Sequence, residues 1–285
     1  MMLGQGRAAA ITDDDMAALA VDLGCHPATL EAIAKVESAG FGWFDDGRIK
    51  ILPEPHKFDD YLPTAKREEA LKRGLATASY NATKASGHYK RMTTKAGPRY
   101  EFFARMIAFD ERAAYMAISV GTYQIMGFNH EVCGYPTAKA MFEGFVESEA
   151  NQLRSFGLFL SDKGLRGALA REDFDQVELK YNGGGLGGSY AKRMRAEAAA
   201  LKRGKWSKWP SDWPGKGKAP AQSPQPAPAP AQHAPQPVPT PQPAKAAPVL
   251  EPTRNDGTFQ APASEPGPWA QFASFLANLF RRSPK

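Results

Sequence analysis

In PATLEAIAKVESAGFGWFDDGRIKILPEPH, residues 27–56, the pattern of apolar side chains changes twice. Pro27 suits the first turn of a helix, and Leu30, Ile33 and Ala34 recur at helical spacing. We therefore predict a helix from Pro27 to about Glu37. The glycine-rich run that follows predicts a loop, and the alternation of RIKIL at 48–52 predicts a short strand.

Glu37 falls within the apolar stripe of the predicted helix, because it follows Leu30 by seven positions and Ile33 by four. Burial and the negative end of a helix both raise the pKa of a carboxyl group. Such a group can hold a proton near neutral pH and deliver it as a general acid. The alternative is a structural glutamate that pairs with an arginine or a backbone amide.

Glu54 stands between Pro53 and Pro55, directly after the predicted strand, so its backbone is stiff. Two carboxyl groups that flank a glycosidic bond are what glycoside hydrolysis needs. A glutamate in a loop is otherwise usually solvated surface. Glu37 and Glu54 are therefore a candidate catalytic pair, and each also has a purely structural interpretation.

Helical patterns continue along the rest of residues 1–218. Thr12 is a helix cap ahead of three aspartates, and Gly24 ends that helix. Apolar spacing predicts further helices at 100–118, at 137–160 as one long element, and at 189–203. Residues 63–99 are polar and irregular, with partial helix expected at 66–75. The prediction is a mainly α fold with a small β element near residues 48–52.

Composition divides the chain. Fifteen of the 24 prolines lie between Pro220 and Pro268, a segment too poor in apolar side chains to form a core. We predict a folded domain at 1–218, a disordered Pro/Ala/Gln-rich linker at 219–266, and a helical tail at 267–285.

Charge and cysteine content narrow the class of function. The net charge of +6 is modest, which argues against a dedicated nucleic-acid binder and suits work on an anionic polymer. Cys25 and Cys133 form no disulfide framework, and His130 with Cys133 lacks a second ligand pair, so we expect no metal and no cofactor. The N-terminus has no apolar run of signal-peptide length, so we expect synthesis in the cytoplasm.

Two short motifs suit a sugar-binding site. SVGTYQIMG, from Ser119, offers an aromatic ring in Tyr123, an amide in Gln124 and hydroxyl groups. Tyr181 and Asn182 precede a glycine run. The alternative for the first motif is a tight turn beside the core, and the second is a weak signal by itself.

The tail carries six large apolar side chains at helical spacing, followed by two arginines. Such a helix is too short to span a bilayer, so it either lies on a membrane or a partner, or folds back on the domain. The six are Trp269, Phe272, Phe275, Leu276, Leu279 and Phe280.

Four segments together resemble the phage-type N-acetylmuramidase domain of endolysins from phages of Gram-negative hosts. The resemblance covers residues 12–203, and its most specific motifs are Glu-Ser-x-Gly at Glu37 and Gln-Ile-Met-Gly at Gln124. The four segments are VESAGFGWFDDGRIKILPEPH at 36–56, SVGTYQIMGFNH at 119–130, FVESEANQLRSF at 145–156 and YNGG at 181–184.

The resemblance implies a lysozyme-like helical fold that cleaves the β-1,4 bond between N-acetylmuramic acid and N-acetylglucosamine. It implies Glu37 as the general acid and Glu54 as the second carboxylate, with peptidoglycan as the partner. We expect a monomer that binds no nucleic acid and acts on the wall after release from the cell. The alternatives are a lytic transglycosylase, which needs one carboxyl group, and a non-catalytic wall-binding protein. The residues expected to line the site are Ser119, Tyr123, Gln124, Tyr181 and Asn182.

Overall fold

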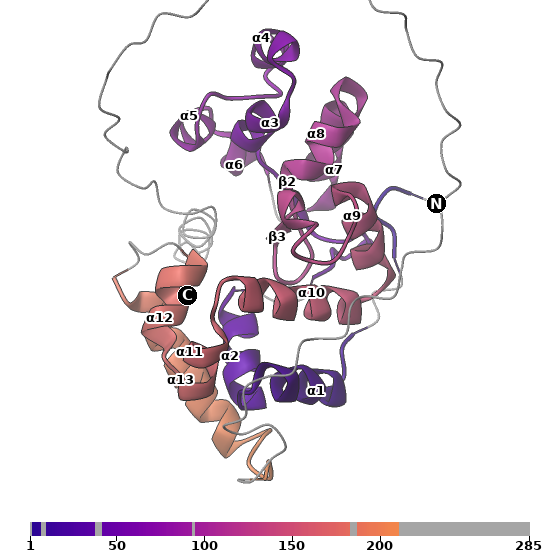
Figure 1. Ribbon diagram of the computed structural model, residues 1–285. Coiled ribbons are helices and arrows are strands. Elements are labelled where there is room, and N and C mark those ends of the chain that lie inside the picture. Colours follow the sequence, from indigo (N-terminus) through magenta and orange to yellow (C-terminus); the bar gives the residue numbers. More distant parts are fainter. Residues whose placement is uncertain (1, 7–9, 38–41, 93–94, 183–186, 211–285) are drawn as a thin grey trace, which may run out of the picture. The chain divides into compact units, whose positions relative to one another are not determined.

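The computed structural model describes residues 2–6, 10–37, 42–92, 95–182 and 187–210; the side chains of Glu37 and Asn182 are outside this description. Figure 1 shows that these residues are mostly helical, as predicted. The helices are α1 Asp13–Leu23, α2 Pro27–Glu37, α3 Pro55–Tyr61, α4 Thr64–Lys72, α5 Tyr80–Ala85, α6 His88–Arg91, α7 Ala96–Phe109, α8 Glu111–Met116, η1 Gly127–Asn129, α9 Ala138–Glu147, α10 Glu149–Asp162, α11 Arg166–Arg171, α12 Phe174–Asn182 and α13 Ser189–Arg203.

Three short strands form an antiparallel sheet in the order β1 (Ile51–Pro53), β2 (Ile118–Val120) and β3 (Ile125–Met126). The small β element is therefore confirmed, but the regular strand begins at Ile51 rather than at 48. Arg48 and Ile49 make only isolated bridges. Alternation is detectable at β1 because it begins ahead of the strand, at Arg48, whereas β2 and β3 offer only three and two residues.

Two of the predicted helices are wrong in extent. The helix predicted at 100–118 is divided at Asp110, and the one predicted at 137–160 is divided at Ser148. Each dividing residue has an extended backbone and accepts a hydrogen bond in its side chain from the first turn of the helix that follows. Apolar spacing continues across both breaks, so it does not reveal the polar residue that starts a new helix.

The helix predicted from Pro27 is confirmed, and it packs along α13 (Figure 1). Its apolar residues Leu30 and Ile33 are completely buried. At the end of α13, Trp206 is buried and its indole N–H donates to Glu31 Oε2 at 2.7 Å. The hydrogen bond ties the turn after α13 to the middle of α2, so the last described residues hold α2 in place.

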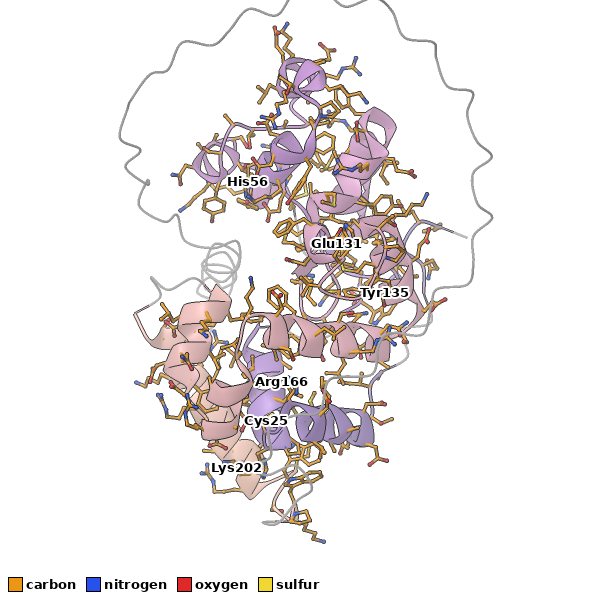
Figure 2. The ribbon with its side chains drawn as sticks, viewed as in Figure 1. Cys25, His56, Glu131, Tyr135, Arg166 and Lys202 are labelled. Carbon is orange, nitrogen blue, oxygen red and sulfur yellow. The ribbon has the colours of Figure 1, made fainter. Side chains whose placement is uncertain are left out.

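A second set of polar contacts closes the same side of the core. Arg166, labelled in Figure 2, donates to the backbone oxygen of Asp22 at 2.6 Å, near the end of α1. Lys202 pairs with Glu172, and Thr29 Oγ1 also donates to Glu172. These contacts join α1 to the start of α11, and α2 and α13 to the turn after α11.

All described residues belong to one compact unit. The predicted domain boundary at 218, the linker at 219–266 and the tail helix at 267–285 lie outside the described residues. Within the residues that the structure does describe, no helix is both long and apolar enough to cross a membrane.

Candidate active site

Glu37 is the last residue of α2. Leu30 and Ile33 of the same helix are in the core. The backbone of Glu37 therefore lies on the buried side of α2, as the apolar stripe predicts. The Glu37 side chain and residues 38–41 lie outside the described part of the chain. The environment of the Glu37 carboxyl group therefore stays a prediction.

Glu54 occupies the junction between β1 and α3. Its N–H donates to the backbone oxygen of Ala117 at 2.9 Å, and its own backbone oxygen accepts from Phe58 N at 2.9 Å. Pro55 supplies the first residue of α3, where a missing N–H costs nothing. The Glu54 side chain does not cap the helix, so its carboxyl group is available for other contacts.

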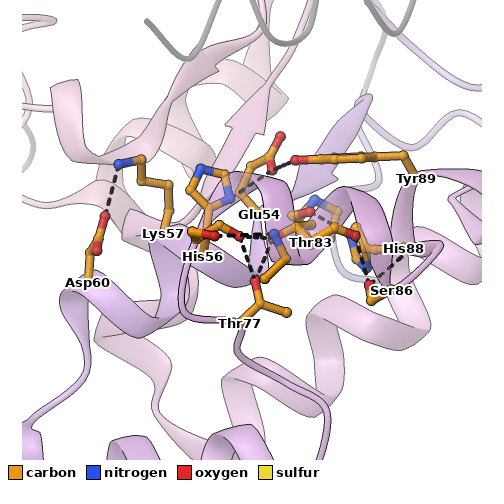
Figure 3. Close-up of polar contacts among 12 residues, drawn as sticks. Glu54, His56, Lys57, Asp60, Thr77, Thr83, Ser86, His88 and Tyr89 are labelled. Carbon is orange, nitrogen blue, oxygen red and sulfur yellow. Dashed lines mark hydrogen bonds and ion pairs between the residues drawn. The ribbon is translucent and has the colours of Figure 1, made fainter. Parts of the chain in front are cut away.

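The Glu54 carboxyl group is buried, with 12% of its side chain exposed. Tyr89, from α6, donates its hydroxyl hydrogen to Glu54 Oε2 at 2.5 Å (Figure 3). Burial raises the pKa of Glu54 to about 8, against the opposing effects of the Tyr89 hydrogen bond and of the charges of Lys57 and Arg99. In the free protein Glu54 is thus mostly protonated at neutral pH.

Two histidines lie beside this carboxyl group. His56 Nδ1 is 3.5 Å from Glu54 Oε2, and burial lowers the pKa of His56 to about 4. The His56 ring is therefore neutral at pH 7, and the contact is not an ion pair. His88 Nε2 lies 2.9 Å from the backbone oxygen of Pro53, and its pKa is likewise lowered by burial to about 4. Both rings pack as neutral groups around the end of β1.

Arg99, from α7, supports the other edge of β1. Its guanidinium is buried and donates to the backbone oxygen of Ile51 at 2.9 Å. The sequence pattern predicts polar loops around His88, Tyr89 and Arg99, and none of the three is among the predicted site residues. No local pattern indicates them, because each reaches β1 only through the fold.

The β2–β3 hairpin contains three of the residues predicted to line the site: Ser119 in β2, and Tyr123 and Gln124 in the turn. Ser119 Oγ donates to Gln124 Oε1 at 2.9 Å, and Gln124 Nε2 donates to the backbone oxygen of Gly121 at 2.7 Å. Both side chains are buried, so in the free protein they close the turn on itself. Tyr123 is 1% exposed and stacks on Phe156 with ring centroids 4.3 Å apart.

Tyr181 lies at the other side of the same aromatic cluster. Its ring is buried and meets Phe156 edge-on at 6.0 Å. Phe156 therefore connects Tyr181 with Tyr123. The side chain of Asn182, the fifth predicted residue, is outside the described part of the chain. Direct glycan contact by these five residues stays a prediction; in the free protein, the four whose side chains are described support the turn and the core.

Thr122, which the prediction omits, is the partly exposed residue of this turn. Its N–H donates to Gln152 Oε1 at 2.7 Å, and its hydroxyl donates to Glu149 Oε1 at 2.8 Å. Glu149 and Gln152 lie in the first turn of α10. The break at Ser148 therefore places the start of α10 against the β2–β3 turn.

The described residues contain no group of three or more His, Cys, Asp or Glu side chains that is arranged to hold a metal ion. His130 Nδ1 contacts the backbone oxygen of Tyr135 at 2.9 Å, and Cys133 Sγ contacts that of Ser155 at 3.9 Å. The pair with ligand-like spacing in the sequence is thus engaged with backbone groups.

The sequence profile of N-acetylmuramidase matches residues 26–202. The chain belongs to the N-acetylmuramidase family. This muramidase is also similar to a Burkholderia AP3 phage endolysin of known crystal structure, with 28% sequence identity and a TM-score of 0.59. The similarity covers 68% of this chain and 72% of the other. A comparison with curated proteins finds no match.

Family membership and the endolysin-like fold make this chain a glycoside hydrolase of peptidoglycan. The matched range contains both candidate carboxylates and the whole β2–β3 turn. It excludes residues 1–25 and 203–285.

Proposed function

We propose that this muramidase hydrolyses the β-1,4 bond between N-acetylmuramic acid and N-acetylglucosamine, with Glu37 as the general acid and Glu54 as the second carboxylate. The observation that carries the proposal is the buried Glu54 carboxyl group, which a tyrosine hydroxyl holds at the junction of β1 and α3. Burial that raises the pKa of a carboxyl group to about 8 is typical of functional sites, whereas burial with a donor alone also occurs at the structural Glu31.

In this mechanism the Glu37 proton passes to the glycosidic oxygen as the bond to the muramyl C1 breaks. Water then adds to C1, and its proton must leave. Glu54 takes that proton as a base, or stabilises the positive charge that develops at the sugar ring. Both roles require the charged form of Glu54, whereas burial favours the neutral form. Three neighbours favour the charged form, because each lowers the pKa of Glu54: Tyr89, Lys57 and Arg99.

A lytic transglycosylase is the second candidate, and the raised pKa of Glu54 favours it. A transglycosylase needs one carboxyl group, and the 6-hydroxyl of the muramyl residue replaces water as the nucleophile. Hydrolysis leaves a reducing end, whereas the transglycosylase leaves an anhydro sugar. Under this second candidate, Glu54 would not be required as a charged partner.

Mass spectrometry of purified peptidoglycan digested with the full-length protein tests both candidates. We expect reducing muramyl ends from the wild type, none from Glu37→Gln, and few from Glu54→Gln. Glu68→Gln is the matched control, because Glu68 has 80% of its side chain exposed and pairs only with Lys72 among the described residues. Anhydro products, or an unimpaired Glu54→Gln, would overturn the two-carboxylate hydrolase.

We further propose that the protein is a monomer that binds no nucleic acid and reaches the wall after release from the cell. The tail would then contact anionic membrane surfaces through its six apolar residues at 269–280. The support for this role is the amphipathic spacing and the two terminal arginines of the sequence.

A further inference from the structure

Lys50 lies on the chain segment that connects the two candidate carboxylates. Its N–H donates to the backbone oxygen of Gly42 at 2.8 Å, and its own oxygen accepts from Gly121 N at 2.8 Å. Gly42 is the first described residue after the loop that follows Glu37, and Gly121 begins the β2–β3 turn. The Lys50 backbone is thus fixed between two segments of the site.

The alternation of the strand places Lys50 and Glu54 on the same side. Lys50 and Glu54 both hydrogen-bond through the backbone to the β2 segment, at Gly121 and Ala117, so they occupy alternate positions of one extended run and share a face. At a strand rise of about 3.3 Å per residue, Lys50 lies about 13 Å along the chain from Glu54. Arg99 interacts electrostatically with both side chains, which agrees with a shared face.

The Lys50 ammonium is partly buried, and it makes no hydrogen bond or ion pair with any described residue. Other lysines of this region have acidic partners: Lys57 pairs with Asp60 at 2.8 Å, and Lys66 pairs with Asp110 at 2.9 Å. Burial lowers the pKa of Lys50, and the positive charge of Arg99 lowers it further, against the opposing effect of the Asp45 charge, which forms no ion pair with Lys50.

A partly desolvated cation beside a second cation is unfavourable until an anion joins it. An incoming carboxylate would relieve the repulsion between Lys50 and Arg99. The substrate carries such groups on the muramyl side alone: the lactyl carboxylate in peptide-free strands, or the carboxylates of the attached peptide.

We propose that Lys50 binds a carboxylate of the muramyl residue or of its peptide, and so determines specificity for peptidoglycan over neutral glycans. This inference rests on the proposed hydrolysis. It predicts an interaction with bound substrate that is the same before and during bond cleavage, so it acts on KM rather than on kcat.

The test uses three soluble glycan substrates: peptide-bearing strands, strands freed of peptide by an amidase, and the freed strands with their lactyl carboxylates chemically converted to neutral amides. Release of reducing ends is measured with the wild type, Lys50→Met and Lys50→Arg. Lys72→Met is the matched control, because Lys72 lies on α4 with 66% of its side chain exposed.

We expect Lys50→Met to raise KM on carboxylate-bearing strands roughly tenfold, as for a lost hydrogen bond to a charged group, with kcat within about twofold. The Lys50→Arg variant should retain most of the affinity. Added salt should narrow the difference in KM between Lys50→Met and the wild type. An increase on the peptide-freed strands alone assigns the contact to the lactyl carboxylate, and an increase on peptide-bearing strands alone assigns it to the peptide. An increase on both shows that Lys50 accepts either carboxylate.

An unchanged KM on both charged substrates would overturn the inference. An equal increase on the neutral amide strands would also overturn it, because the loss would then be one of shape rather than of charge. Thermal unfolding of Lys50→Met verifies that the variant is folded. If the wild type releases anhydro ends instead of reducing ends, the proposed hydrolysis fails, and the KM for release of those ends tests Lys50 in the same way.

Discussion

The hydroxyl of Tyr89 donates to Glu54 Oε2 at 2.5 Å, across 35 positions of the sequence. Tyr89 lies on α6, a helix of four residues, whereas Glu54 lies at the end of β1. The orientation of the carboxyl group therefore depends on how α5 and α6 pack against the sheet, and Tyr89 is a positioning residue for Glu54.

Removing this hydrogen bond should change the pH dependence of the reaction. Tyr89→Phe removes a contact that lowers the pKa of Glu54, so that pKa should rise above about 8. If the charged form is active, kcat/KM rises with pH, and the rising limb should move to higher pH in the variant. We expect a loss of severalfold at pH 7 and a smaller loss at pH 9. Tyr61→Phe is the control, and an unshifted limb would contradict the positioning role.

Stability should depend on the protonation of Glu54. Its pKa is about 8 in the folded protein, against 4.5 as the ordinary value, so the folded state retains a proton that the unfolded chain releases between these pH values. Stability contributed by the bound proton is therefore lost as pH rises through this window. Glu54→Gln should raise Tm relative to the wild type more at pH 9 than at pH 6.5. The free-energy difference between the two pH values should be on the order of a few kcal/mol.

Glu37→Gln should abolish turnover of peptidoglycan and leave the helical circular dichroism spectrum intact. The substitution preserves the size of the side chain and removes the proton that a general acid supplies. We expect Glu54→Gln to reduce turnover less, because Glu37 still donates its proton to the leaving oxygen in that variant. A Glu37→Gln variant with wild-type turnover would end its assignment as the acid.

A comparison of two glycines separates the steric cost of an added side chain from the cost of backbone strain. Gly121 and Gly74 both have positive φ, at +77° and +65°. An added Cβ at Gly121 would lie 2.3 Å from Gln152 Oε1, whereas nothing lies within 4 Å at Gly74. Gly74→Ala should cost about 1 kcal/mol of unfolding free energy from backbone strain. Gly121→Ala should cost about 1–3 kcal/mol more, because it displaces Gln152 from Thr122. Equal losses in denaturant melts would show that the turn does not depend on that contact.

Deleting residues 219–285 should leave a protein that folds and cleaves purified peptidoglycan, because both candidate carboxylates precede that point. Contact with anionic vesicles should weaken, since the deletion removes six apolar residues and two arginines. Co-sedimentation of the full-length and truncated proteins with such vesicles measures this. Equal, negligible pelleting of both would remove the membrane role, and a lower Tm of the truncated form would indicate a tail that docks on the domain.

Local patterns predict the helices that begin and end with clear signals. Thr12 and Asp15 form the capping box that starts α1, and Gly24 ends it with φ at 74°, as the sequence indicates. The same reasoning places Glu37 at the end of α2 and Glu54 directly after a strand.

Contacts between distant segments lie beyond such patterns. Tyr89 and Arg99 reach Glu54 and β1 only after α5–α7 have packed. The motif of Ser119 and Gln124 suggests hydroxyl and amide groups that await a sugar, but in the free protein these groups bind each other. A sequence lists donors and acceptors, and the fold determines which of them are already engaged.

The extended backbone of Ser148 has an evolutionary consequence. Because Ser148 interrupts the helix, the rotation of α10 about its own axis is not fixed by that of α9. Insertions or deletions ahead of Ser148 can be absorbed at this joint without turning Glu149 and Gln152 away from Thr122. Related chains can therefore vary in the loop before α9 while they keep the β2–β3 turn intact, and an alignment should place its length differences on the N-terminal side of Ser148.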